Sequence, residues 1–163
     1  MDQKELERLK EQERKNGFAV YNHIEMVLAE RDHAIYRLNI RPESKNPYGM
    51  VHGGAIYTMA DNATGAAAHT DGRNYVTQTS ALHFLRNQPE GEIQADARVR
   101  HRGRSTCLVT VDILGGRDPA GHRRIHLLLC GREAHGAAGP EGAIKNRGDG
   151  RCPSLRYSVR LNF

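Results

Sequence analysis

The sequence predicts an α+β fold in which one long buried helix lies against an antiparallel sheet. From His52 to about His69 the residues are mostly Gly, Ala, Ile, Met and Thr with almost no charge, which is typical of a helix buried on all sides. Segments with apolar residues at alternate positions stand before and after this stretch, and 92–100 alternates most cleanly. Short links containing Gly separate the later segments, so those strands are expected to be antiparallel.

The first elements along the chain are a helix and two strands. Residues 2–15 are rich in good helix formers, and Gly17 is the expected stop. Strand candidates follow at 21–32 and 33–42, the second of which ends in proline. Residues 46–49, Asn-Pro-Tyr-Gly, have the composition of a turn that leads into the long helix.

Three or four strands are expected after the helix. They are the candidates 75–86, 91–103 and 105–116, with a further candidate at 122–130. Beyond them the sequence is rich in Gly and Arg without a sustained period, which indicates irregular structure. The chain of 163 residues therefore divides into an N-terminal helix at 1–17, a folded domain at 18–130 and a tail at 131–163.

The net charge of +5 raises the question of nucleic-acid binding. Residues 1–120 carry equal numbers of basic and acidic residues, and the whole excess lies in 121–163, with eight basic and three acidic residues. A basic tail does not describe the body of the protein, so no nucleic-acid partner is predicted.

The same composition indicates a cytoplasmic protein. No run of about 18 apolar residues is present, which predicts no membrane span. The first 17 residues are charged throughout and lack the apolar centre of a signal peptide. The three cysteines are widely spaced, without a Cys-x-x-Cys motif, which fits reduced thiols better than disulfides or a metal site.

The segment 46–61 reads NPYGMVHGGAIYTMAD and is followed by the F-L-R element of 84–86 and by the Arg-Gly-Arg element of 102–104. Together these motifs resemble the hotdog-fold acyl-CoA thioesterases, the superfamily of the phenylacetyl-CoA and 4-hydroxybenzoyl-CoA thioesterases. The resemblance covers roughly residues 18–118. It implies a long central helix wrapped by an antiparallel sheet, paired into homodimers and commonly homotetramers.

Two residues on the long helix carry the chemistry that the resemblance implies. Gly53 and Gly54 lie at the helix N-terminus, where free backbone N–H groups and the helix dipole would polarise a thioester carbonyl. Asp61 is the nucleophile or the general base for water. Eight residues separate Gly53 from Asp61, about 12 Å along a helix, so they would meet only across a dimer. The alternatives are a tight turn for the glycines and a structural Asp bonded to backbone or to Asn62.

Four more polar residues are candidates for assisting this chemistry. His52 would hold the thioester or water, or would cap the helix. By resemblance Asn46 contacts substrate or water, with a simple turn role as the alternative. Thr77 and Thr79 are expected on one face of a strand, where Thr77 would orient water and Thr79 would contact substrate; threonine is also simply common in strands.

Substrate-binding candidates complete the predicted site. Arg102, Gly103 and Arg104 form a basic turn that suits the phosphates of CoA, with a solvated hairpin tip as the alternative. The acyl pocket has three candidates, for which core packing is the alternative: Tyr48, Met50 and Tyr57.

The last predicted strand departs from the family. Relatives continue with small-x-Gly-x-Phe-x-Phe-Phe, whereas this chain reads HRRIHLLLCGREAHG. One hypothesis is a shifted reading frame near 119–122, because codons for His-Arg-Arg-Ile-His-Leu-Leu can read Thr-Gly-Glu-Phe-Thr-Phe-Phe in a neighbouring frame. The gene sequence tests this: if no single-base change there restores the family pattern, the hypothesis is wrong.

The sequence as a whole predicts a homodimeric or homotetrameric acyl-CoA thioesterase that needs no metal or redox cofactor. One alternative is an acyl-CoA-binding module without catalysis. A hotdog dehydratase or hydratase is less favoured, because the spacing of a catalytic His and acid for that reaction is not found.

Overall fold

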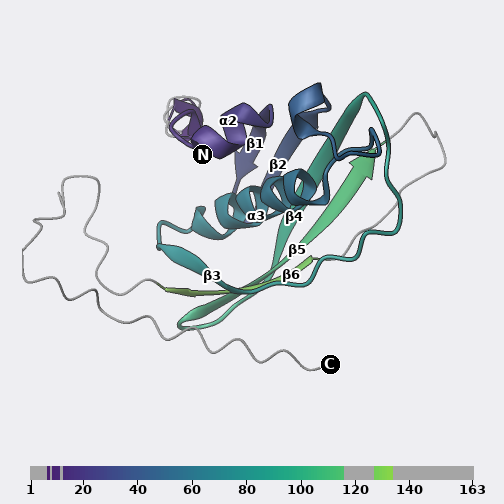
Figure 1. The fold of residues 1–163 in the computed structure, drawn as a ribbon. Helices are drawn as coiled ribbons and strands as arrows, with labels where there is room; N and C mark the ends of the chain where they lie inside the picture. Colours follow the sequence, from purple (N-terminus) through teal and green to yellow (C-terminus); the bar gives the residue numbers. More distant parts are fainter. Residues whose placement is uncertain (1–6, 8, 12, 116–126, 134–163) are drawn as a thin grey trace, which may run out of the picture.

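The computed structural model describes residues 7, 9–11, 13–115 and 127–133. Within them one long helix lies across one face of a six-stranded sheet (Figure 1). The elements are α2 (Gly17–Tyr21), β1 (Ile24–Glu30), β2 (His33–Asn39), the 3-10 turn η1 (Pro42–Ser44), α3 (Gly53–His69), β3 (Tyr75–Thr79), β4 (Glu92–Arg102), β5 (Thr106–Gly115) and β6 (Leu127–Glu133).

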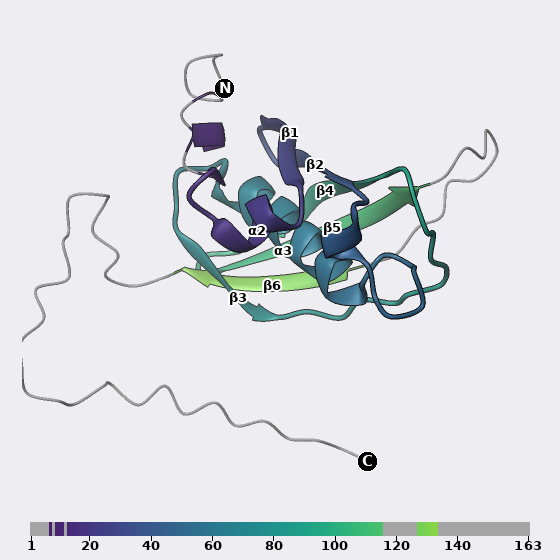
Figure 2. The same cartoon turned by 45° about the horizontal axis from the view of Figure 1, so that its top comes forward.

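Every strand pair in the sheet is antiparallel, in the order β1-β2-β4-β5-β6-β3. The predicted α+β class, with a long helix against an antiparallel sheet, is therefore confirmed. Strand β3 lies at the sheet edge on the far side from β1 (Figure 1). Helix α2 lies against β1 at the opposite edge of the sheet (Figure 2).

The core forms where small residues of α3 let the helix approach the sheet closely. Five alanines of α3 are at most 3% exposed, and Met59 is fully buried among them. They pack against inward-facing residues of the central strands, such as Tyr36, Leu38, Ala95, Val109 and Val111. Dense packing of this kind resists changes of even one methylene group.

The composition of α3 predicted a helix buried on all sides, and within this chain that prediction is wrong. Its other face is half-buried or exposed in this chain, and includes Tyr57, Asp61 and Gly65. Low charge on both faces misled the prediction, because composition does not say which neighbours belong to the same chain.

The predicted end of the N-terminal helix is wrong. Gly17 does not stop a helix but begins α2, because the Asn16 side chain accepts a hydrogen bond from Ala19 N at 3.2 Å and caps it. Residues 7, 9–11 and 13 are helical, as predicted for 2–15; the other residues of that prediction before 13 lie outside the described part.

The strand predicted at 75–86 ends at Thr79. Strand β3 pairs with β6 rather than with β4, so 80–91 is an irregular connection and not a short link. The last strand, β6, continues to Glu133, past the predicted end at 130. Residues 131–133, predicted as the start of the irregular tail at 131–163, belong to β6. The rest of that tail, 134–163, lies outside the described residues, and the division of the chain into three parts stays a prediction.

Candidate active site

The entry to α3 is organised by His52. Its backbone is extended and its Nδ1 accepts a hydrogen bond from Gly54 N at 2.9 Å, so His52 is the N-cap. A Cβ on Gly54 would lie 3.0 Å from that Nδ1. Glycine at 54 therefore serves the cap, and the capping alternative for His52 is the one that the geometry shows.

Gly53 is different, because packing does not require a glycine there. A Cβ at this position would make only ordinary contacts of 3.5 Å with the Phe84 ring. As the first helical residue, Gly53 has no partner for its N–H inside the helix, and no other described residue accepts from it. The N–H is thus a free donor at the positive end of α3.

The carboxylate of Asp61 is held by the edge strand. Thr77 Oγ1 donates to Asp61 Oδ1 at 2.8 Å, and both residues line a cavity of about 630 Å³. Among the described residues the other carboxylate oxygen, Oδ2, accepts no hydrogen bond. Asn62 is not the partner that the structural alternative required, since its buried Nδ2 bonds no described residue.

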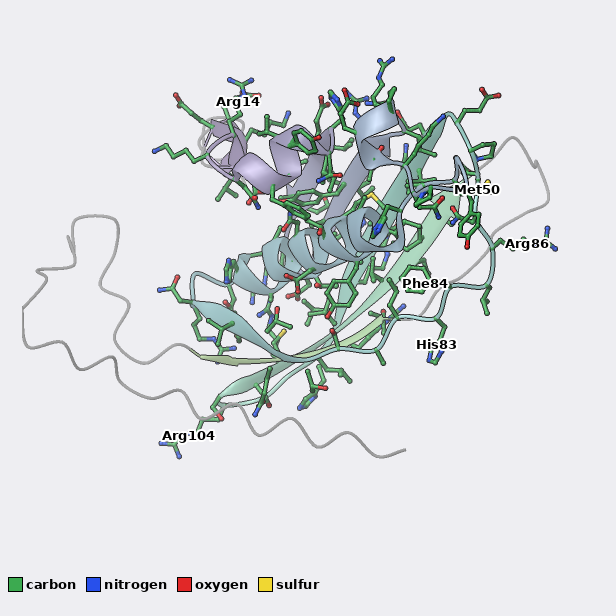
Figure 3. All side chains as sticks on the ribbon, viewed as in Figure 1. Arg14, Met50, His83, Phe84, Arg86 and Arg104 are labelled. Atoms are coloured by element: carbon green, nitrogen blue, oxygen red, sulfur yellow. The ribbon has the colours of Figure 1, made fainter. Side chains whose placement is uncertain are left out.

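Two further residues on the Asp61 face of α3 contact the chain after β3. Tyr57 OH and Ser80 Oγ form a hydrogen bond, and Gly53 lies against the Phe84 ring. A spacing of four residues places Gly53, Tyr57 and Asp61 along one side of the helix. Phe84 lies beside the N-terminal half of α3 (Figure 3).

Sequence reasoning missed Ser80 and Phe84, because 80–86 was read as a strand. The signal for Phe84 in the sequence was the Phe of the F-L-R element, but the sequence does not say which residue that ring contacts. Thr79 is exposed. A register shift makes Thr77 and Thr79 pair with consecutive residues of β6, so the expectation that both lie on one face loses its basis.

Asn46 builds a turn. Its Oδ1 accepts hydrogen bonds from the backbone N–H groups of Tyr48 at 3.0 Å and Met50 at 3.1 Å, the pattern of an Asx turn. Gly49 completes the turn with a positive φ of 74°. Tyr48 is 88% exposed, so core packing does not explain it in this chain.

Arg102 does not lie in an open basic turn. Its side chain is 15% exposed and its Nε donates to Asp32 at 2.7 Å. Its Nη1 donates to Asp71 at 2.9 Å, and both Nη atoms bond carbonyl oxygens at the end of α3, those of Ala67 and Ala68. These bonds occupy its donors and leave none for a phosphate. The guanidinium caps the C-terminus of α3, and the geometry gives no support to a CoA role.

Asp71 is the buried anion of the Arg102 cluster. Burial alone would raise its pKa, but hydrogen bonds from the Arg73 backbone and side chain and from Tyr75 OH, together with the Arg102 charge, lower the pKa to about 2. Burial alone would lower the pKa of Arg102, but the hydrogen bond to Asp32 and the neighbouring groups Cys107, Asp71 and Tyr75 together raise it. The cluster is therefore charged throughout the physiological range.

The remaining turn residues have separate roles. A Cβ on Gly103 would lie 2.9 Å from Thr106 Oγ1, so the tight β4–β5 turn requires glycine. Arg104 is exposed, and its side chain points away from the sheet at the opposite end from Phe84 (Figure 3). Of the predicted basic pair, only Arg104 is open to a ligand.

In the part of the chain that the structure describes, no helix has the length and apolarity to cross a membrane. No three or more His, Cys, Asp or Glu side chains there gather as a metal would require.

Known proteins share both the sequence motif and the fold. Residues 48–119 match the model of the thioesterase superfamily. The acyl-coenzyme A thioesterase PaaI of Escherichia coli is 26% identical over 92 residues, which are 56% of this chain and 66% of that protein. A protein of Saccharolobus solfataricus that is named as an esterase is 25% identical over 91 residues, which are 55% of this chain and 65% of that protein. The chain thus spans about two thirds of these curated relatives.

Solved structures agree on the fold. The E. coli PaaI structure superposes with a TM-score of 0.68 at 19% identity, covering 77% of this chain and 91% of that one. A Streptococcus mutans protein bound to acetyl-CoA gives 0.61 at 27% identity, covering 68% and 88%. The architecture is that of the hotdog fold. The match to the thioesterase superfamily model ends at residue 119, near the position where the sequence departs from the pattern expected of that family.

Proposed function

We propose that this protein hydrolyses acyl-CoA thioesters to a free acid and CoA. The observation that carries the proposal is that one open face of α3 presents two groups. They are the free N–H of Gly53 and the single carboxylate of the helix, Asp61, which Thr77 holds by a hydrogen bond. The reaction needs no metal or redox group. The acetyl-CoA bound by the S. mutans relative supports the choice of CoA thioesters.

Gly53 N–H donates to the thioester oxygen and stabilises the negative charge that develops there, a contribution of typically about 3 kcal/mol. Asp61 then acts in one of two ways. As general base it takes a proton from water, whose oxygen attacks the carbonyl carbon while the C–S bond breaks and the thiolate takes the proton. As nucleophile it attacks the carbonyl carbon, and the C–S bond breaks to give an anhydride and the CoA thiolate. Water then cleaves the anhydride, which releases the acid, returns the Asp61 carboxylate and leaves a proton for the thiolate.

In either route Thr77 fixes one carboxylate oxygen and leaves Oδ2 available. His52 and Asn46 act indirectly, by building the helix entry that presents Gly53. Arg104 is the residue left to contact a CoA phosphate, and Tyr57 lines the acyl side.

The site is completed by a second copy of the chain. Eight residues of one helix hold Gly53 and Asp61 about 12 Å apart, too far for one carbonyl. An antiparallel partner helix laid on the open face of α3 brings the Asp61 of one chain to the Gly53 of the other. Strand β3 favours the same assembly, because it is a sheet edge on which four of five residues are exposed.

The test of the function is release of thiol. The purified protein is incubated with acetyl-, butyryl-, octanoyl- and phenylacetyl-CoA, and free CoA is measured with a thiol reagent. We expect turnover of at least one thioester. Binding of these compounds without release of thiol would instead support the acyl-CoA-binding alternative.

The shared site predicts complementation between two inactive variants. Asp61→Ala removes the acid, and Gly53→Val puts branched carbons against the Phe84 ring at the donor. In a heterodimer one site combines the intact Asp61 and Gly53, and the other has both defects. Mixing should restore up to about half the wild-type activity per heterodimer. If the variants fold and exchange subunits but stay inactive, the cross-subunit pairing is wrong.

A further inference from the structure

A continuous strap of the chain, residues 77–84, runs antiparallel to the open face of α3. It begins at Thr77, which is bonded to Asp61, and ends at Phe84, which packs on Gly53. Beyond Thr79 it is not part of the sheet. The strap therefore borders the whole distance between the proposed acid and the proposed donor.

The strap is fixed at its middle. Tyr57 OH and Ser80 Oγ form a hydrogen bond one helical turn from each end of the face. Farther along, Asn87 Nδ2 donates to Val51 O at 3.0 Å and Val51 N donates to Gln88 O at 2.9 Å. Phe84 is held between these attachments, although its side chain is 52% exposed.

We propose that Phe84 is a specificity-determining residue, which limits branching at the acyl carbon next to the thioester carbonyl. The inference rests on the function proposed above. Ring atoms Cε1 and Cζ of Phe84 lie 3.5 Å from the position that a Cβ of Gly53 would take. A carbonyl oxygen that accepts from Gly53 N–H must come within about 3 Å of that nitrogen, so the acyl carbon next to the carbonyl enters the space around Gly53 that the ring borders.

An unbranched carbon at this position fits next to the ring, whereas a methyl branch on the same carbon would contact the ring. A misfit of one methyl in a rigid apolar site typically changes kcat/KM by 10- to 200-fold. The slot thus lies between the backbone of Gly53, which has no side chain, and the Phe84 ring.

The experiment compares butyryl-CoA with isobutyryl-CoA, which have the same atoms and differ in branching. We expect Phe84→Ala to raise the ratio of kcat/KM for isobutyryl-CoA to that for butyryl-CoA by about 10-fold. Leu85→Ala is the matched control, since Leu85 is the next residue and 68% exposed, and it should leave the ratio unchanged. Phe84→Leu, which keeps an apolar side chain, should raise the ratio less and serves if the alanine variant does not fold.

A second variant tests the slot from its other side. Gly53→Ala adds a methyl group 3.5 Å from the ring and should lower the same ratio, and Phe84→Ala in that background should recover it. If the wild type releases thiol from both substrates but Phe84 variants leave the ratio unchanged, or Leu85→Ala changes it equally, the role of Phe84 is wrong and the thioesterase function stands. If no CoA thioester is hydrolysed, the proposed function fails and the inference with it.

Discussion

Asp61→Asn should abolish most turnover, with a loss in kcat of about 1,000-fold or more, while folding and assembly stay intact. The amide keeps the shape of the carboxylate and can still accept the Thr77 hydrogen bond, now 2.8 Å long. It cannot take a proton from water, and it is a poor nucleophile. Since the interaction is needed in the transition state, kcat should fall far more than KM changes.

The measurement is thiol release under saturating substrate, with size-exclusion chromatography as the check on assembly. Glu90→Gln is the matched control, because it makes the same chemical change at an exposed acid in the connection before β4, and it should retain wild-type kcat. Near wild-type turnover of Asp61→Asn would remove Asp61 from the reaction.

Arg102→Ala should reduce the free energy of unfolding by about 3–5 kcal/mol, the usual result of removing one partner of a buried ion pair. The truncation removes one of the two cations that pair with Asp71, whose side chain is 9% exposed, and leaves Arg73 as its remaining partner. It also removes the donors that satisfy the last carbonyl groups of α3, at Ala67 and Ala68. Chemical denaturation measures the loss.

Arg104→Ala is the control for Arg102→Ala. It removes the same side chain two residues further on, where it is exposed, and should change stability by no more than about 0.5 kcal/mol. Arg102→Lys keeps the charge but cannot reach the same set of acceptors as the planar fork, so it should recover only part of the loss. Equal stability of the two alanine variants would contradict the capping role.

The local pattern was sufficient for most of the elements. Apolar alternation predicted β1, β2, β4 and β5, and the uncharged stretch predicted α3 from Gly53 to His69. These signals depend on which residues face a core, a property that repeats every two or 3.6 residues along the chain. The His-Gly-Gly turn was equally readable, because capping and glycine freedom act between neighbours in the sequence.

Tertiary structure alone decided where β3 lies and what Arg102 does. Strand β3 joins β6 rather than β4 because its hydrogen-bonding partner is more than 50 residues away, and no local pattern specifies that choice. Arg102 was predicted to lie in an exposed basic turn, yet it ends β4 and bonds Asp32 and Asp71, which are 70 and 31 residues distant. Once they are close, burying the charge among them becomes favourable.

The sequence by itself determined the α+β class, the long helix and the placing of Gly53 and Asp61 on that helix. The fold decided which glycine the packing requires, since Gly54 is confined by His52 and Gly53 is not. It also decided that residues after Thr79 leave the sheet and lie along α3 as a strap that ends at Phe84. The reason is that side-chain direction and contacts between distant segments depend on packing in three dimensions, which the order of residues along the chain does not state.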